Sequence, residues 1–220
     1  MYSAALFLVM AFPKILAAEE KINYVALGDS YTIGTGAAPQ YAWPSVITGK
    51  LKADGIKIEL IANLAKAGWD TQNVIDYQLP IFEKFKPTFA TLLIGTNDVV
   101  RDVDKRTFKH NLSFILDEVT ATLPDKHRLL VVTIPDFSVA PAGAQFADPK
   151  KMRQKITEFN DIIKEEAKKR DLNVFDLFPV SQTMKDTAYF SSDGLHPSAK
   201  GYDLWALAIY EKFKKILSSK

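Results

Sequence analysis

Five short runs of apolar residues recur along the chain, and each is rich in branched side chains. Their apolar character is largely continuous, with little of the regular alternation that a half-exposed strand shows. Continuous runs of this length are typical of strands that are buried on both faces, as in a parallel sheet. The pattern therefore predicts buried strands at Tyr24–Leu27, Ile56–Ala62, Ala90–Ile94, Leu129–Ile134 and Val174–Leu177.

The longer segments between these runs have helical periodicity. In one of them Met152, Ile156 and Phe159 fall on one face at steps of three and four, which indicates packing on a core rather than a binding site. Strands that alternate with helices in this way predict an α/β domain with a doubly wound, five-stranded parallel sheet. The predicted helices are Trp43–Ala53, Gln72–Phe85, Lys105–Leu123, Lys151–Lys169 and Ser198–Leu217.

The segment from Pro135 to Pro149 interrupts this alternation, because it is rich in proline and has no clear periodicity. Long irregular loops inside compact domains are uncommon and often functional. We therefore regard the segment as a candidate wall of a substrate pocket. An ordinary surface loop is the alternative.

The N-terminal residues differ in composition from the rest of the chain. Ala4–Pro13 is an uninterrupted apolar run, and small residues follow it up to Ala18. Such a run is too short to span a bilayer but suits a secretory signal peptide. We predict a signal peptide over residues 1–20, a single domain over residues 21–220, and a periplasmic or secreted location. Because no basic residue precedes the run and Lys14 interrupts its end, a packed N-terminal helix in a cytoplasmic protein is the alternative.

The charge balance and the residue types restrict the classes of function. The chain has 28 basic and 26 acidic residues, a net charge of +2 and no long block of one sign. We therefore expect neither a nucleic-acid partner nor stable membrane insertion of the mature chain. The absence of cysteine excludes thiol nucleophiles and thiolate metal sites. Since no typical metal-ligand spacing is present either, we expect no metal and no cofactor.

Three residues that are distant in the sequence supply the parts of a serine acyl hydrolase. Ser30 follows the first predicted strand, and Asp193 lies three residues before His196 in the loop that precedes the last helix. A serine hydroxyl is a weak nucleophile unless a base removes its proton, and a carboxylate must orient that base. We interpret Ser30 as nucleophile, His196 as base and Asp193 as its partner. The alternative for Ser30 is a turn or helix cap.

Two further residues follow predicted strands and are candidate donors to a developing oxyanion. Gly68 follows the second strand and Asn97 the third, so both are expected at the carboxyl edge of the sheet, where ligands bind in open parallel sheets. With the Ser30 backbone N–H, they would supply three donors that are in place before the reaction. Taken singly, each has an ordinary alternative, a loop glycine for Gly68 and a turn cap for Asn97.

Together these motifs resemble the SGNH hydrolases, also called the GDSL esterase/lipase family. The similar blocks are Gly28-Asp29-Ser30, Asn63 to Gly68, Gly95-Thr96-Asn97-Asp98 and Asp193-x-x-His196, in the family's order. The resemblance implies a flavodoxin-like three-layer α/β/α sandwich, ester or thioester hydrolysis, and the roles given above. The segment around Trp43 resembles the bacterial thioesterase/lysophospholipase and arylesterase branch.

The sequence thus predicts a serine esterase that acts on a small-molecule ester through an acyl-enzyme. Short- to medium-chain acyl esters are the expected substrates, with thioesters and lysophospholipids also considered, because aromatic residues lie next to the candidate catalytic residues or in the irregular segment. A carbohydrate O-deacetylase with the same residues and a non-catalytic flavodoxin-like binding module are the alternatives. The oligomeric state is not predicted. The candidate pocket residues are Tyr31, Trp69, Phe137 and Phe146.

Overall fold

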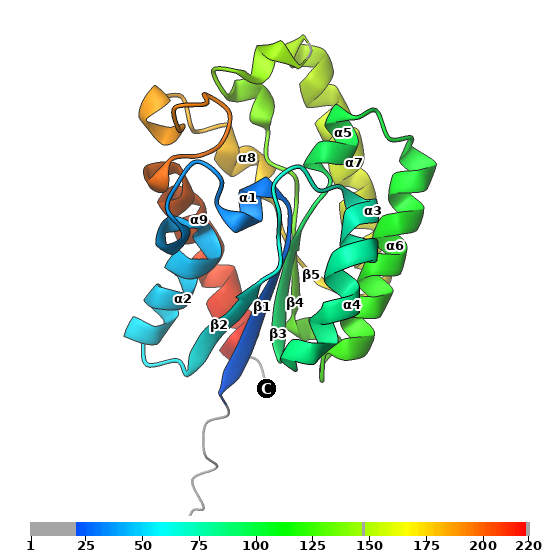
Figure 1. Ribbon diagram of the computed structural model, residues 1–220, viewed down its shortest axis with the longest axis vertical. Helices are drawn as coiled ribbons and strands as arrows, with labels where there is room; N and C mark the ends of the chain where they lie inside the picture. The colour runs from blue at the N-terminus through cyan, green and yellow to red at the C-terminus, as the bar shows by residue number, and fades with distance from the viewer. Residues whose placement is uncertain (1–20, 147, 219–220) are drawn as a thin grey trace, which may run out of the picture.

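The computed structural model describes residues 21–146 and 148–218, and it confirms the predicted α/β class (Figure 1). The predicted signal peptide, residues 1–20, lies outside the described residues. Five strands form one sheet, and their bounds overlap all five predicted strands. They are β1 Ile22–Gly28, β2 Ile58–Asn63, β3 Phe89–Leu93, β4 Leu129–Val132 and β5 Asn173–Phe175.

The sheet has the strand order β2-β1-β3-β4-β5, and every neighbouring pair is parallel. This is the flavodoxin-like order, in which the winding direction reverses between the neighbouring strands β1 and β3. The register brings Gly28 at the end of β1 beside Leu93 at the end of β3. The crevice at this reversal is therefore framed by the loops that carry Ser30 and Asn97.

Helices cover both faces of the sheet, as the alternation of elements predicts (Figure 1). Helix α2 (Trp43–Ala53) packs on α9 (Ala199–Ser218) on one face, and α6 (Lys105–Thr122) packs on α7 (Pro149–Lys169) on the other. Helix α2 begins and ends at the predicted residues. The shorter helices of the described region are α1 Ser30–Ile33, α3 Thr71–Asn73, α4 Leu79–Phe82, α5 Thr96–Val100 and α8 Phe178–Ser181.

The segment predicted as one helix over 72–85 is divided in the structure. Between α3 and α4 the chain forms a π-helical turn, Val74–Gln78, and after α4 a 3₁₀ turn, Glu83–Phe85. Periodicity alone does not distinguish these forms, because all of them place apolar residues at similar intervals. The π-helical turn matters for the site, since it sets the position of Gln78.

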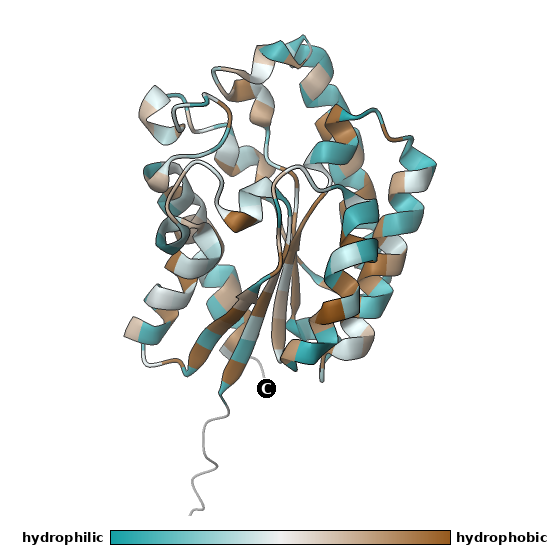
Figure 2. Ribbon diagram, viewed as in Figure 1, coloured by the Kyte–Doolittle hydropathy of each residue, from teal (hydrophilic) through white to brown (hydrophobic). Residues whose placement is uncertain are grey.

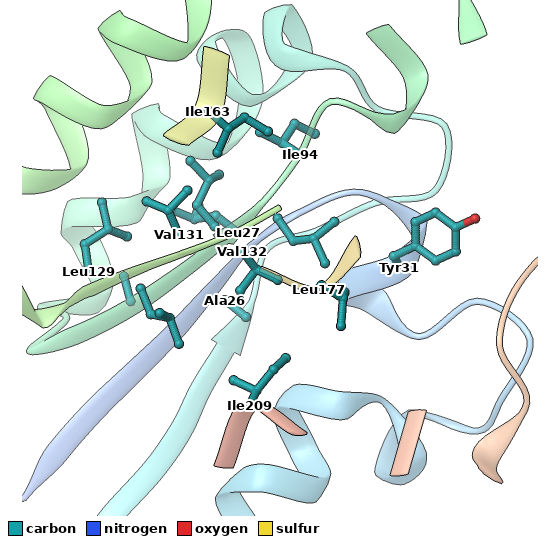
Figure 3. Close-up of a cluster of buried hydrophobic side chains, with 14 of the residues drawn as sticks. Ala26, Leu27, Tyr31, Ile94, Leu129, Val131, Val132, Ile163, Leu177 and Ile209 are labelled. Carbon is teal, nitrogen blue, oxygen red and sulfur yellow. The ribbon is translucent and has the colours of Figure 1, made fainter. Parts of the chain in front are cut away.

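The hydrophobic core lies between the sheet and the two helical layers. The strands are largely apolar, whereas the outer faces of the helices are polar (Figure 2). In Figure 3, Ile163 of α7 and Ile209 of α9 approach the sheet from opposite sides, and Val131 lies between the two layers; all three are buried. Burial on both faces explains why the strands read as continuous apolar runs.

Candidate active site

Ser30 lies at the carboxyl end of β1, where the chain turns sharply into α1. Gly28 has a φ of +150°, and a Cβ at this position would lie 2.2 Å from the Leu93 carbonyl oxygen, so only glycine fits between the two strand ends. Asp29 caps α1 by accepting a hydrogen bond from the Tyr31 backbone N–H at 3.0 Å. Ser30 thereby becomes the first residue of a helix and faces the crevice at the sheet edge.

A buried glutamine holds the turn before Ser30 in place. The Gln78 side chain accepts from the Gly28 N–H at 3.0 Å and donates to the Gly28 carbonyl at 2.7 Å. Both backbone groups of Gly28 are thus satisfied away from water, as buried polar groups must be. The sequence analysis does not identify Gln78, since its partner lies 50 residues away and no local pattern marks the pair.

His196 and Asp193 reach Ser30 from the loop before α9. The imidazole Nε2 lies 2.9 Å from the Ser30 hydroxyl, and Nδ1 lies 2.7 Å from the Asp193 carboxylate. These are hydrogen-bond distances of the kind that a serine nucleophile, a base and an orienting carboxylate require. The structure therefore brings together three residues that are separated by up to 166 positions in the chain.

The carboxylate of Asp193 is held by its own turn. Its Oδ1 accepts hydrogen bonds from the backbone N–H groups of Leu195 and His196 at 2.8 and 2.9 Å and from the Ser191 hydroxyl at 2.7 Å. Partial burial raises the pKa of Asp193, but the hydrogen bonds from His196, Leu195 and Ser191 outweigh it and keep that pKa well below its usual range. The carboxylate is therefore charged at neutral pH and suited to orient the imidazole.

Asp29, which directly precedes Ser30, has its pKa shifted in the opposite direction. The side chain of Asp29 is inaccessible to solvent, and this burial raises its pKa to about 7, although a hydrogen bond from the Tyr31 backbone opposes the rise. Asp29, which is next to Ser30 in the chain, and Asp193, which is bonded to His196, thus have opposite pKa shifts. The one that contacts the imidazole is the one whose charged form is stabilised.

Gly68 and Asn97 come from the segments that follow β2 and β3. Gly68 has a φ of +80°, and Asn97 belongs to α5 and donates one amide hydrogen to the Trp69 carbonyl at 2.8 Å. Neither the Ser30 nor the Gly68 backbone N–H has a hydrogen-bond acceptor among the described residues. Both N–H groups and the second amide hydrogen of Asn97 are thus available to a ligand oxygen.

A cavity of about 180 Å³ opens at these residues. Its polar lining comes from the candidate catalytic and oxyanion residues, and its apolar wall from aromatic and aliphatic side chains. Tyr31, Phe137 and Phe146 are among the residues that line it, but Trp69 is not. The Trp69 ring instead stacks on Tyr77, with 5.3 Å between the ring centroids. The remaining lining residues are Ser30, Ala67, Gly68, Thr96, Asn97, Val100, Leu195 and His196.

The irregular segment between β4 and α7 supplies two of these aromatic rings. Phe137 and Phe146 lie edge to face, with 6.2 Å between their centroids. The buried carboxylate of Asp136 fixes the start of the segment, since it accepts hydrogen bonds from Arg153 at 2.7 Å and from Gln182 at 2.9 Å. This part of the segment is a wall of the cavity rather than a free surface loop.

A flavodoxin-like sheet with serine, histidine and aspartate in hydrogen-bond contact at its carboxyl edge is the arrangement of an α/β acyl hydrolase. The chain belongs to the GDSL-like lipase/acylhydrolase family, which it matches over residues 26–204. It is a carboxylic ester hydrolase of this family, as the SGNH-type motifs indicate.

Solved structures of several hydrolases share the fold. TesA is 16% identical, with a TM-score of 0.73, and the match covers 88% of this chain and 99% of that one. A lipase/acylhydrolase from Enterococcus faecalis is 22% identical, with a TM-score of 0.72 and coverage of 90% and 99%. A family 3 carbohydrate esterase from Clostridium thermocellum is 20% identical, with a TM-score of 0.72 and coverage of 90% and 98%. Comparison with curated proteins gives no match.

Among the described residues, none of the helices combines the length and the apolar character that crossing a bilayer requires.

Proposed function

We propose that the protein hydrolyses short- to medium-chain acyl esters through a covalent acyl-enzyme on Ser30. The observation that carries this proposal is the hydrogen-bonded series from Asp193 through His196 to the Ser30 hydroxyl, which ends in a small, mainly apolar cavity. A binding protein has no need of an oriented base beside a serine. Membership of a hydrolase family also argues against the binding-module alternative.

In the proposed mechanism, His196 Nε2 accepts the proton of Ser30 while the serine oxygen attacks the acyl carbonyl. Asp193 holds the other ring nitrogen in the protonated tautomer and stabilises the imidazolium that forms. The imidazolium then returns the proton to the leaving alcohol, and the carbon–oxygen bond to that alcohol breaks. Water, activated by the same imidazole, hydrolyses the acyl-enzyme and restores the serine hydroxyl.

The negative charge on the attacked oxygen is stabilised by the N–H groups of Ser30 and Gly68 and by the side-chain amide of Asn97. These donors are most effective when they are already aimed at the position where the charge develops. The free N–H groups of Ser30 and Gly68 support this role. The bond from Asn97 to the Trp69 carbonyl supports it further, because it limits rotation of the amide.

The size of the cavity favours small acyl groups. The cavity of about 180 Å³ is smaller than the roughly 300–1,000 Å³ that is typical of pockets for drug-sized ligands. Tyr31, Phe137 and Leu195 line both this cavity and a smaller apolar pocket beyond it. Of the three, Phe137 is the one that lies outside the turns that carry Ser30 and His196. We therefore assign Phe137 as the residue that limits the length of the acyl chain.

Removal of an acetyl group from a carbohydrate is the second candidate function. A small acyl pocket suits acetyl groups as well as butanoyl groups, and one fold relative is described as an acetylxylan esterase from Geobacillus stearothermophilus. The catalytic residues would be the same. The two candidates differ only in the alcohol that is released, so the nature of the leaving group decides between them.

The chain-length preference is tested with 4-nitrophenyl esters from two to sixteen carbons, together with acetylated xylan and an acyl-thioester. We expect the highest kcat/KM between two and six carbons. Phe137→Ala is expected to move the optimum to longer chains, because it joins the two pockets, whereas Phe114→Ala, a change at an exposed phenylalanine of α6, leaves the optimum unchanged. A wild-type optimum at twelve carbons or more would contradict the proposal, and preferential release of acetate from xylan would favour the second candidate.

We also propose that the protein is exported, on the basis of the apolar run and the small residues that follow it in residues 1–20. Expression of the full chain in a bacterium, followed by fractionation and mass determination, tests this. A periplasmic or secreted product that begins near Glu19 supports export. A full-length product confined to the cytoplasm would contradict it.

A further inference from the structure

Arg101 connects the two loops that carry the candidate oxyanion donors. It follows α5 directly, and its backbone N–H donates to the Asn97 carbonyl at 2.9 Å. Its guanidinium group extends to the other loop, where Nη2 donates to the Gly68 carbonyl at 2.7 Å and Nη1 pairs with the Asp70 carboxylate. One residue thus bonds to the backbone of both Gly68 and Asn97.

Apart from Arg101, the turn at Gly68 is closed by a local bond from the Trp69 N–H to the Lys66 carbonyl at 3.3 Å, which leaves the Gly68 N–H unpaired among the described residues. The φ of Gly68, +80°, lies in the left-handed region, and beyond its two chain neighbours no described heavy atom lies within 4 Å of the position that a Cβ would occupy. A glycine in open space has more conformational freedom than any other residue. A bond to the Gly68 carbonyl therefore restricts the conformation of this residue and, with it, the direction of its N–H.

The anchor for Arg101 on this loop is itself fixed. The second oxygen of Asp70 accepts from the Asn73 N–H at 3.0 Å, and the Asn73 side chain accepts from the Asp70 N–H at 3.2 Å, which forms a capping box. The guanidinium therefore bridges a rigid carboxylate and the Gly68 carbonyl. A planar group with several N–H donors suits this double contact, and a lysine ammonium does not reproduce it.

We propose that Arg101 is a positioning residue of the oxyanion hole, which keeps the Gly68 N–H aimed at the same point as the Asn97 amide. Arg101 does not line the cavity, and it acts through Gly68 rather than on the substrate. The proposal rests on the oxyanion role given above to Gly68 and Asn97. Because misaligned donors stabilise the transition state less while leaving substrate binding intact, the loss of Arg101 affects kcat more than KM.

The test compares Arg101→Ala and Arg101→Lys with Arg106→Ala, which removes the same charge from an exposed position on the first turn of α6. With 4-nitrophenyl acetate, we expect kcat of Arg101→Ala to fall about tenfold with KM within twofold, since a displaced donor costs less than the 10²–10³-fold expected for a lost one. Arg101→Lys should recover less than half of this loss. Arg106→Ala should retain the wild-type kcat.

A second measurement separates positioning from a general effect on folding. Millimolar guanidinium ion, well below denaturing concentrations, should raise kcat of Arg101→Ala and leave Arg106→Ala unchanged, because it replaces the missing group between Gly68 and Asp70. A kcat of Arg101→Ala within twofold of wild type, a raised KM at constant kcat, or equal kcat for the lysine variant and wild type would each overturn the proposal.

Two further comparisons keep the outcome decisive. If Arg101→Ala does not fold, Asp70→Asn is used instead, because it removes the charged partner of Arg101 while Arg101 remains. A fall in kcat of Asp70→Asn at unchanged KM supports the proposal, whereas an unchanged kcat overturns it. The wild-type protein and Asn97→Ala are measured in the same assay. A wild-type protein without esterase activity would refute the proposed function itself. An Asn97→Ala variant with the wild-type kcat would refute the proposed oxyanion hole. Both outcomes are distinguishable from failure of the Arg101 proposal alone.

Discussion

The turn that contains Asp193 and His196 and the loop that contains Gly68 bring chemical groups to the same cavity, but they are held in different ways. In the turn, the carboxylate of Asp193 is bound by groups within three residues of it. The Gly68 loop also has local bonds, such as that from the Trp69 N–H to the Lys66 carbonyl, but its Gly68 and Trp69 carbonyls and its Thr71 N–H bond to α5 and to Arg101, 27 to 33 positions away. Residues of the turn itself therefore fix the position of the Asp193 carboxylate, whereas the position of the Gly68 loop also depends on α5 and Arg101.

This difference has a functional consequence. A change at α5 is expected to disturb the proposed oxyanion donors, Gly68 and Asn97, while the hydrogen bonds between His196 and Asp193 remain intact. A change within the turn is expected to do the reverse. Variants of the Gly68 loop and α5 should therefore differ from variants of the Asp193–His196 turn in kcat and in the pH dependence of the free energy of unfolding.

The largest effect is expected for Ser30→Ala, which removes the proposed nucleophile that both regions serve. We expect a folded protein whose kcat is at least about a thousandfold lower, as loss of a triad member typically causes. Steady-state hydrolysis of 4-nitrophenyl acetate measures it, with circular dichroism to establish folding. A folded variant that retains more than a tenth of the wild-type rate would refute the nucleophile assignment.

Asn97→Ala tests the loop side alone. We expect kcat to fall by about 10²–10³-fold with little change in KM, because the amide acts on the charge that develops during attack. The same substitution also removes the bond to the Trp69 carbonyl. If KM rises while kcat is unchanged, Asn97 binds the ground state of the substrate and is not an oxyanion donor.

A smaller expected effect concerns the pH dependence of stability, which should differ between a variant in α5 and a variant in the Asp193–His196 turn. Burial raises the pKa of Asp98 in the folded protein to about 6, although hydrogen bonds from Thr71 oppose the rise. A raised folded-state pKa contributes stability at low pH that is lost as the pH increases from about 4 through 6. The stability of Asp98→Asn relative to wild type should therefore increase as the pH rises across this window, by up to about 3 kcal/mol.

Asp193→Asn serves as the matched comparison from the turn. The folded-state pKa of Asp193 is lowered, so its contribution to stability is present above about pH 4 and is lost only in stronger acid. Between pH 4 and 5, below the usual range of histidine titration, the stability difference between Asp193→Asn and wild type should be constant. Denaturant unfolding at several pH values measures both variants, and equal pH dependence for the two would contradict the contrast drawn here.

The difference between local and long-range contacts also explains which features of the structure are predictable from the sequence. The parallel α/β fold was predictable because its strands are buried on both faces, and α2 even begins and ends at the predicted residues. The short spacing of Asp193 and His196 is likewise visible in the sequence. Arg101 and Gln78 leave no comparable signal, because their partners lie 33 and 50 residues away.

Side-chain direction is the other limit of prediction from sequence. Trp69 follows Gly68 directly and was expected in the pocket, yet its ring stacks on Tyr77 outside the cavity lining. Phe137 and Phe146 are nine residues apart in an irregular segment and both line the cavity. Adjacency in the chain places a Cα atom, but packing with distant residues decides where the ring points.

The central claim is that Ser30 is the nucleophile that His196 and Asp193 activate. Reaction with a fluorophosphonate, followed by peptide mass spectrometry, tests it most directly, because the serine oxygen displaces fluoride and keeps the phosphonyl group. We predict one adduct, on the peptide that contains Ser30, slower labelling of Asp193→Asn, and no adduct on Ser30→Ala. An adduct on another residue, or equal labelling of Ser30→Ala and the wild-type protein, would contradict the account.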